Sequence, residues 1–255
     1  RIYLNPNVES NRYWIYGDLC PCIILVDENG RVMSYKFGFD SEKDVKYIAN
    51  LIDKMRVRTS APYKVGDYYN ENGMQGVVFE VDATGKHGKI VSLTESTSKL
   101  QWSSDEYEQK RLIGADSKSD GAKNMDVVKR IPDWQSKYPA FKWCADLGEG
   151  WYLPAIDELK IFTLDNTVHD AVNRTLETKG KKLANKGQYR WYWSSTEGTY
   201  TTSKGIHSVK LVRMNFDESG EHGKDLTDDY TFTRIRAIAK FGNGASNSYS
   251  NNNYS

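Results

Sequence analysis

The strongest local folding signal in this 255-residue chain lies in residues 150–159, which read Gly-Trp-Tyr-Leu-Pro-Ala-Ile-Asp-Glu-Leu. An apolar, aromatic stretch ends at Pro154, and an amphipathic run begins directly after it. Proline is tolerated in the first turn of a helix because its missing N–H has no partner there. Asp157 and Glu158 suit the positive end of the helix dipole. The segment therefore predicts an extended stretch that leads straight into a helix.

Short strands and turns surround this segment and indicate a meander of short strands. Asn72-Gly73 and residues 83–88 separate apolar runs, and Asn and Gly tolerate the positive φ angles of tight turns. The alternating and helical patterns predict strands at residues 63–69, 76–82, 89–93, 207–216 and 232–241, and helices at residues 122–131 and 140–147.

Residues 1–56 have a different character from the rest of the chain. Two apolar runs, residues 22–27 and 32–36, flank an Asn-Gly pair and predict a β-hairpin. Apolar residues at helical spacing predict a helix over residues 42–55. This ββα order, with Pro21 before the first strand, resembles the C-terminal half of a thioredoxin-like domain, in which a cis-proline occupies that place. The half that would carry a CxxC motif is absent, so redox activity does not carry over. The alternative is a small α/β extension of the main domain.

The composition excludes several classes of function. The chain carries 35 Lys and Arg against 34 Asp and Glu, a net charge of +1, which lacks the basic footprint of a nucleic-acid binder. No apolar run approaches the roughly 20 residues of a membrane-spanning helix. The phosphate-binding GxxxxGK[ST], dinucleotide-binding GxGxxG and nucleophile GxSxG motifs are all absent. We therefore expect no nucleic-acid partner and no membrane-spanning segment.

Cysteine and histidine are sparse. The three cysteines, Cys20, Cys22 and Cys144, form neither a disulfide framework nor a CxxC redox motif. The four histidines are scattered, and no spacing suits a zinc site. We therefore expect no metal and no other cofactor. The chain begins at Arg1 rather than Met, so we expect that an N-terminal segment has been removed.

Three motifs occur in order along residues 63–241: G-W-Y-L-P-A-I-D-E-L, Y-W-S-S-T-E and R-I-R-A-I-A-K-F. Supporting segments are Y-K-V-G-D-Y-Y, G-V-V-F-E-V, D-G-A-K-N-M and Y-P-A-F-K-W-C-A-D-L. Together they resemble the Fibrobacter succinogenes major paralogous domain family, bacterial extracellular domains similar to C-type lectins. The resemblance implies an α+β domain in which two main helices flank small antiparallel sheets beside a long irregular loop region. It also implies an extracellular or cell-surface lipoprotein, anchored through the removed N-terminal segment.

The chain is therefore expected to consist of four segments. They are a partial thioredoxin-like element (residues 1–56), a linker (57–62), a C-type-lectin-like domain (63–241) and a disordered Asn/Ser/Tyr-rich tail (242–255). The linker is polar and ends in a proline, and the tail contains no residue suited to a packed core.

Most residues of the three motifs are expected to have structural roles. Trp151, Leu153 and Trp193 are candidate core residues, because a buried aromatic side chain removes much apolar area from water. Ser194 and Ser195 are expected to satisfy backbone groups in a turn rather than attack a substrate. No histidine stands near them in the sequence, and a serine nucleophile needs a base. No catalytic residue is assigned.

The charged motif residues have equally plain interpretations. Pro154 is expected near the helix start, Glu158 is expected to cap the helix or to suit its dipole, and Arg236 is expected to fix a carboxylate within the fold. Asp157 and Glu158 do not form a catalytic carboxylate pair, because adjacent helix positions point about 100° apart.

We expect a non-enzymatic binding or adhesion module. Calcium-dependent sugar-binding lectins carry an E-P-N or Q-P-D triplet and a later W-N-D, and neither occurs here, so calcium-bridged sugar binding is not expected. Ligand contact is expected at exposed aromatic and polar groups of the loop region, namely Tyr189, Trp191, Tyr200, Asn215 and Asp217. The alternative is that these side chains lie mostly in the core. Aromatic faces serve both sugar stacking and protein hot spots, so the expected partner is a glycan or a protein at the cell surface.

Two other functions fit parts of the sequence. The first element would belong to a thiol oxidoreductase whose CxxC half is missing from this chain. Sulfatase-modifying oxidases have a lectin-like fold but rely on two active-site cysteines, and Cys144 stands alone in its helix.

The last ten residues are only Ser, Asn and Tyr, as in variable proteins of diversity-generating retroelements. The alternative for these ten residues is a featureless linker end.

Overall fold

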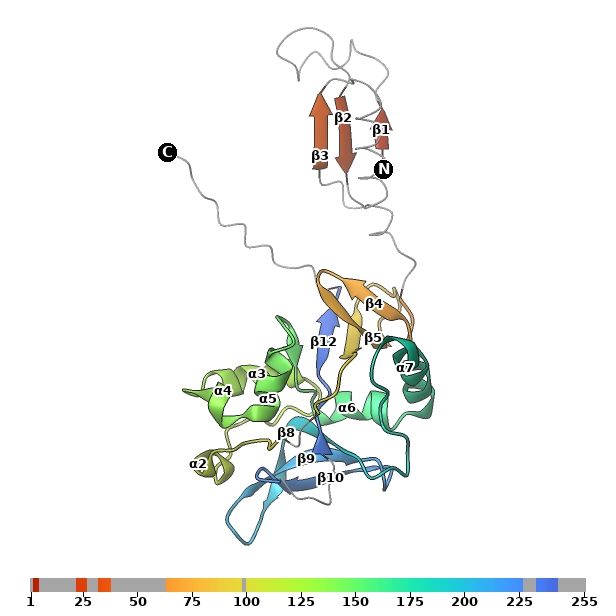
Figure 1. Cartoon of the computed structure of the whole chain (residues 1–255). Helices are drawn as coiled ribbons and strands as arrows, with labels where there is room; N and C mark the ends of the chain where they lie inside the picture. The colour runs from red at the N-terminus through yellow and green to blue at the C-terminus, as the bar shows by residue number, and fades with distance from the viewer. Residues whose placement is uncertain are drawn as a thin grey trace, which may run out of the picture. The chain divides into compact units, whose positions relative to one another are not determined.

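The chain divides into two compact units, Arg1–Ala61 and Pro62–Ser255 (Figure 1). The computed structural model describes residues 2–4, 22–26, 32–37, 63–97, 100–226 and 233–242. The expected linker and nearly all of the expected tail lie outside the described residues.

The first unit contains a three-stranded antiparallel sheet of order β1-β2-β3. The predicted hairpin is confirmed, because β2 (Cys22–Val26) pairs antiparallel with β3 (Val32–Phe37). A further strand, β1 (Ile2–Leu4), pairs with the other edge of β2 and was not predicted. Pro21 and the expected helix over residues 42–55 lie outside the described residues.

A five-stranded sheet forms one layer of the second unit. Its strands, in the order in which they pair, are β4 (Tyr68–Glu71), β5 (Met74–Val81), β6 (Gly88–Ser92), β12 (Ile238–Phe241) and β7 (Trp151–Tyr152). Asn72 and Gly73 join β4 to β5 with φ angles of 53° and 78°. Two successive positive φ values match the turn that favours Asn-Gly in hairpins, so the predicted turn is confirmed.

A four-stranded sheet forms the other layer. Its strands, in order, are β10 (Glu218–Gly223), β9 (His207–Arg213), β8 (Trp191–Thr201) and β11 (Thr233–Arg234). β11 lies parallel to β8, whereas the other pairs are antiparallel. The single strand expected over residues 232–241 is wrong, because β11 and β12 belong to different sheets. The three residues between them cross from one sheet to the other, and Ile235 N–H leaves the ladder to bond Ser96 Oγ at 3.0 Å.

The described part of the chain holds six helices, whereas the resemblance implies two main ones. They are α2 (Glu106–Gln109), α3 (Gly121–Lys129), α4 (Trp134–Lys137), α5 (Pro139–Ala145), α6 (Ile156–Thr163) and α7 (Asn166–Lys179). α3, α5 and α6 occur where helices were predicted, whereas α7, the longest, was not predicted. The second unit is therefore a mixed α+β fold.

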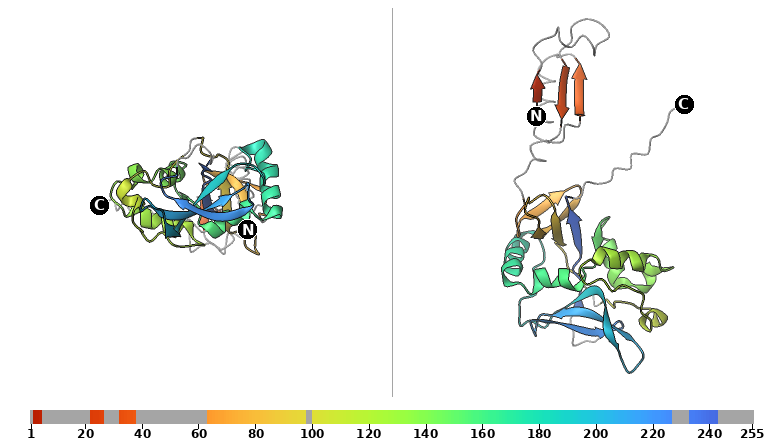
Figure 2. Two further views of the ribbon diagram at one scale, coloured as in Figure 1. Left: turned by 90° about the horizontal axis from the view of Figure 1, so that it is seen from below. Right: turned by 180° about the vertical axis from the view of Figure 1, so that it is seen from behind.

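Helix α6 lies between the two sheets, with α3, α4 and α5 on one side of it and α7 on the other (Figures 1 and 2). Every helix in the described ranges is too short or too polar to cross a membrane.

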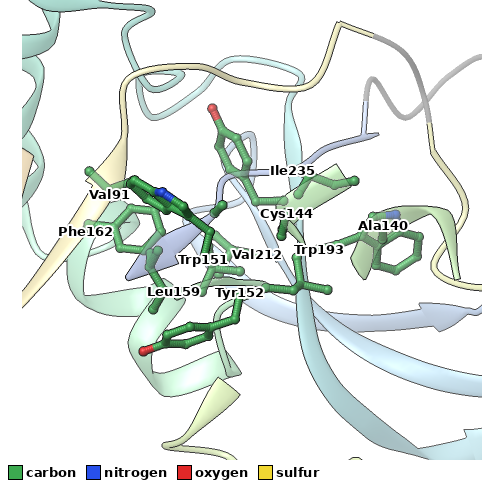
Figure 3. Packing of buried hydrophobic residues seen from close by; sticks show 14 of the residues in the cluster. Val91, Ala140, Cys144, Trp151, Tyr152, Leu159, Phe162, Trp193, Val212 and Ile235 are labelled. Atoms are coloured by element: carbon green, nitrogen blue, oxygen red, sulfur yellow. The ribbon is translucent and has the colours of Figure 1, made fainter. Parts of the chain in front are cut away.

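The core fills the space between α6 and the two sheets. Trp151, Leu159, Phe162, Trp193 and Val212 are all buried there, although they come from four different elements (Figure 3). Large aromatic side chains dominate this core, and each fully buried one stabilises the fold by about 1.5–3 kcal/mol relative to an exposed position. Because the elements are short, these long-range contacts rather than local propensity hold them together.

The start of α3 is pressed against the segment that leads into α6. Gly121 N–H donates to Glu158 Oε2 at 2.9 Å. A Cβ at position 121 would clash with the Leu153 carbonyl oxygen and would lie 2.7 Å from Ala155 N. Only glycine permits this approach, because the neighbouring atoms are backbone and cannot move aside.

The Gly121→Ala substitution is therefore expected to lower the free energy of unfolding by about 3 kcal/mol, through overpacking against backbone. Gly73→Ala is the comparator, since a Cβ at position 73 would meet no atom within 4 Å and only the positive φ opposes alanine. That strain costs about 1 kcal/mol. Urea unfolding followed by tryptophan fluorescence measures both, because six of the seven tryptophans lie in the second unit. Equal losses in the two variants would contradict the proposed close approach.

Candidate ligand-binding site

The hydroxyl-rich segment 194–196 lies within β8, not in the turn expected from the sequence. The pairing of β8 with β9 is irregular between Trp193 and Glu197, so the intervening residues leave the ladder. Ser194 Oγ donates to the Lys210 carbonyl at 2.7 Å, and Ser195 Oγ accepts from Asn124 Nδ2 at 2.9 Å. Both hydroxyls are buried and already engaged, so they anchor neighbouring segments and are not placed as nucleophiles.

Glu158 is a buried carboxylate that joins two helix starts. Its Oε2 accepts from Ala155 N–H and from Gly121 N–H, both at 2.9 Å, which caps α6 and fixes α3. Its Oε1 lies 3.2 Å from Lys89 Nζ and accepts from the Tyr152 hydroxyl at 3.2 Å. Burial, and secondarily this carboxylate, raise the pKa of Tyr152 well above its usual range. With both oxygens occupied, Glu158 acts as a structural group.

Arg236 forms an ion pair with the carboxylate of Glu95, as the sequence predicted, but it donates its hydrogen bonds mainly to carbonyl oxygens. The guanidinium donates to the Ser92, Thr94 and Lys182 carbonyls at 3.0, 3.1 and 3.0 Å, and also to that of Lys181. The carboxylate of Glu95 is farther away, 3.7 Å from Arg236 Nε. Arg236 therefore joins the segment after β6 to the segment after α7. Because its side chain is fully buried, a ligand cannot reach it.

Sequence reasoning missed a buried ion pair between Glu197 and Lys224. Their charged atoms lie 2.6 Å apart, and both side chains are almost entirely excluded from solvent. Glu197 also accepts from the backbone N–H groups of Ile113 and Gly114 at 3.0 and 2.9 Å. Lys224 Nζ donates to the Arg111 carbonyl at 2.6 Å. Burial lowers the pKa of Lys224, and the Glu197 charge opposes that shift. The lysine is 27 residues from its partner, so no sequence spacing predicts the pair.

Four of the five expected ligand-contact residues gather at one end of the four-stranded sheet. Trp191 Nε1–H donates to Asn215 Oδ1 at 2.8 Å, and Asp217 forms an ion pair with Lys186 at 2.8 Å. Tyr189 is 69% exposed in the adjacent segment. That segment is held against the β9–β10 turn by hydrogen bonds of Gly187 N–H to the Met214 carbonyl and of Met214 N–H to the Arg190 carbonyl.

Tyr200 lies apart from these four residues. It follows Trp191 by nine positions along β8, and its hydroxyl donates to the Glu221 carbonyl at 3.2 Å. The structure therefore does not place Tyr200 in the same site.

Three further residues, which the sequence did not single out, cluster with Trp191 in the structure. The Arg213 guanidinium lies 5.1 Å from the centre of the Phe216 ring and 5.9 Å from that of Trp191, and it pairs with Glu218 at 2.5 Å. The ring of His222 lies 6.0 Å from that of Trp191. Phe216 is 58% exposed, so this cluster reaches the surface. Trp191, Arg213, Phe216 and His222 are called the aromatic cluster below.

The aromatic cluster has the properties of a preformed binding surface. Arg213 stacks between two rings, and each such cation–π contact is worth about 0.5–1 kcal/mol at an exposed site. Asn215 fixes the orientation of the Trp191 indole, which limits the conformational entropy that ligand binding would cost.

The opposite face of the same strands carries a charged pair. Glu221 Oε1 lies 2.5 Å from Lys210 Nζ, and Glu221 Oε2 accepts from Thr199 N–H at 2.7 Å and from Ser208 Oγ at 2.8 Å. Burial alone would raise the pKa of Glu221, but these hydrogen bonds outweigh it and lower the pKa to about 2. Glu221 is therefore ionised at any physiological pH.

No protein-family model matches the chain, and no curated protein matches it either. Within the described residues, no three His, Cys, Asp or Glu side chains are grouped so that they could hold a metal ion. The site is therefore characterised by its own geometry alone.

The depressed pKa of Glu221 makes the second unit sensitive to acid. A carboxylate with a folded pKa of about 2 and an ordinary value of 4.5 stabilises the fold above about pH 5, and this contribution is lost as the pH falls toward 2. Urea midpoints between about pH 7 and pH 3 should fall for the wild type and fall less steeply for Glu221→Gln. Glu149→Gln, at an exposed position, is the control and should follow the wild type. Parallel curves for wild type and Glu221→Gln would refute the assignment.

Proposed function

We propose that the second unit is a non-enzymatic binding module with a C-type-lectin-like fold, related to the Fibrobacter succinogenes major paralogous domains. Two small sheets, flanking helices and long irregular segments between β6 and α3 support this relationship. The motif residues Trp151, Leu153 and Trp193 are buried, in keeping with a fold-determining role. The proposed location is the bacterial cell surface or the extracellular space, with the first unit as a thioredoxin-like fragment.

The observation that carries this proposal is the aromatic cluster at the end of the four-stranded sheet. An exposed ring, an arginine stacked on it and a tryptophan locked by a hydrogen bond form a rigid surface of mixed character. Such groups recur at binding hot spots because they contribute large contact area at low entropic cost. The adjacent carboxylate of Asp217 and amide of Asn215 offer polar partners for the hydroxyl groups of a glycan, which is the ligand class we favour.

The side chains that resemble catalytic groups support a role in binding rather than in chemistry. Cys144 is buried, and burial raises the pKa of its thiol, so the reactive thiolate is suppressed. Ser194, Ser195 and Glu158 are all engaged in buried hydrogen bonds. Because these buried groups are already engaged, only the side chains at the surface are available to contact a ligand.

A glycan array probed with the full chain, once with calcium and once with EDTA, tests this function. We expect hits that do not depend on calcium and that weaken by about tenfold or more in Trp191→Ala and in Phe216→Ala, as is typical of aromatic hot spots. Phe216 is largely exposed, so its removal should leave the fold intact. Tyr107→Ala is the matched control, because Tyr107 is an aromatic residue, 71% exposed on α2, outside the cluster.

The other outcomes each count against part of the proposal. Loss of binding in EDTA would overturn calcium-independent recognition. If Tyr107→Ala and Phe216→Ala bind glycans equally well, the aromatic cluster is not the glycan-binding site. A blank array would overturn the glycan class and leave a protein ligand, which pull-down with wild type and Phe216→Ala would then identify.

A further inference from the structure

A polar hollow of about 190 Å³ opens between α6 and the four-stranded sheet. It is lined by Lys118, Ile156, Asp157, Lys160, Lys210, Ser219, Gly220 and Glu221. None of these residues belongs to the aromatic cluster. A volume of this size holds roughly six water molecules, which is smaller than the pockets of about 300–1,000 Å³ that take drug-sized ligands. The hollow therefore suits a single small group.

The register of β9 and β10 separates the hollow from the aromatic cluster. Lys210 pairs with Glu221, whereas Arg213 pairs with Glu218. Successive side chains of a strand point to opposite faces of the sheet, so Lys210 and Arg213, three positions apart, lie on opposite faces. The hollow is thus a separate site, and it does not rest on the function proposed for the cluster.

The charges in the hollow do not cancel. Three lysine ammonium groups face two carboxylates. Lys210 is neutralised by Glu221 at 2.5 Å, and Lys160 pairs more loosely with Asp157 at 3.4 Å, where both side chains are well exposed. An exposed pair of this kind contributes little, so Lys160 remains available. Lys118 makes no side-chain hydrogen bond or ion pair with any described residue.

We propose that this hollow binds an anionic oxygen group, a carboxylate, sulfate or phosphate, through Lys118 and Lys160. An oxoanion there would gain charge-assisted hydrogen bonds from two ammonium groups, which are stronger than neutral ones. The Ser219 hydroxyl offers a further donor on the opposite wall. The anion is either a free ion or the acidic group of one sugar residue, because the volume leaves room for little more.

The backbone around the hollow is fixed without these lysine side chains. Asp157 N–H donates to the Lys118 carbonyl at 2.8 Å, and Ile156 N–H donates to Thr196 Oγ1 at 3.0 Å. Substitution of Lys118 by glutamine therefore removes the charge and leaves the wall in place.

Titration of the ¹⁵N-labelled full chain by NMR tests the site with three probes: sodium sulfate, the methyl glycoside of glucuronic acid and the neutral methyl glycoside of glucose. We expect saturable shifts of the amides of Ile156, Ser219 and Glu221 with at least one anionic probe and none with the neutral one. Lys118→Gln should weaken that binding by about tenfold, the typical value of one charge-assisted hydrogen bond. Lys123→Gln, an exposed lysine on α3 outside the hollow, should bind like the wild type.

The probes distinguish the sources of the anion. Binding of sulfate and glucuronide alike would assign the hollow to oxoanions in general, and binding of the glucuronide alone would assign it to acidic sugars; both support the proposal. Equal binding of the neutral glycoside, an unchanged affinity in Lys118→Gln, or no saturable shift with any probe would overturn it. Because Phe216→Ala leaves the hollow untouched, it should retain anion binding even if glycan binding at the aromatic cluster fails.

Discussion

A buried charge pair, Glu197 with Lys224, joins separate segments of the second unit. The carboxylate collects backbone N–H groups from residues 113–115 as well as the lysine ammonium, and the ammonium lies 4.9 Å from the centre of the Trp102 ring. Burying either charge alone would cost several kcal/mol, so each requires the other. The pair holds the irregular segment before α3 and the segment after β10 against the same strand. A fold with so much irregular chain needs such anchors, because buried backbone groups outside helices and sheets must find other partners.

The same principle accounts for the buried charged residues of the sequence motifs. Glu158 and Arg236 are buried, and each binds backbone groups of a segment far away in the sequence, Gly121 N–H for Glu158 and the Ser92 carbonyl for Arg236. A carboxylate or guanidinium suits this task because it offers several acceptors or donors at once in a fixed geometry. Charged side chains in the motifs therefore hold loops in place through hydrogen bonds. The polar and aromatic groups that a ligand could reach lie instead on the surface of the four-stranded sheet.

The sequence predicted the elements whose signals are local and failed where tertiary contacts decide. The Asn72-Gly73 turn and the helix after Pro154 follow from backbone preferences, and both occur. Helix α7 was missed although Asp165 caps it and Val168, Val172 and Leu176 follow at four-residue spacing, so a stricter search for helical periodicity would have found it.

Strand β10 had no comparable signal. Its sequence, Glu-Ser-Gly-Glu-His-Gly, is poor in the β-branched and aromatic residues that favour strands, and it is extended only because it pairs with β9. Of the candidate site, Trp191 and Asn215 could be proposed from residue type alone. The stacking of Arg213 on Phe216 could not, because it depends on the tight turn between β9 and β10, in which Asp217 has a φ of 54°.

That turn positions both candidate sites together. The pairing of β9 with β10 runs without interruption from Arg213 and Glu218 to Ser208 and Gly223, so the register set at the turn extends along the whole ribbon. A slip by one residue would exchange the two faces of β10 relative to β9. It would separate Lys210 from Glu221 and would move Glu218 away from Arg213. The aromatic cluster and the polar hollow are therefore two separate surfaces. Both depend on the β9–β10 turn, because the register set there aligns the charged residue pair of each.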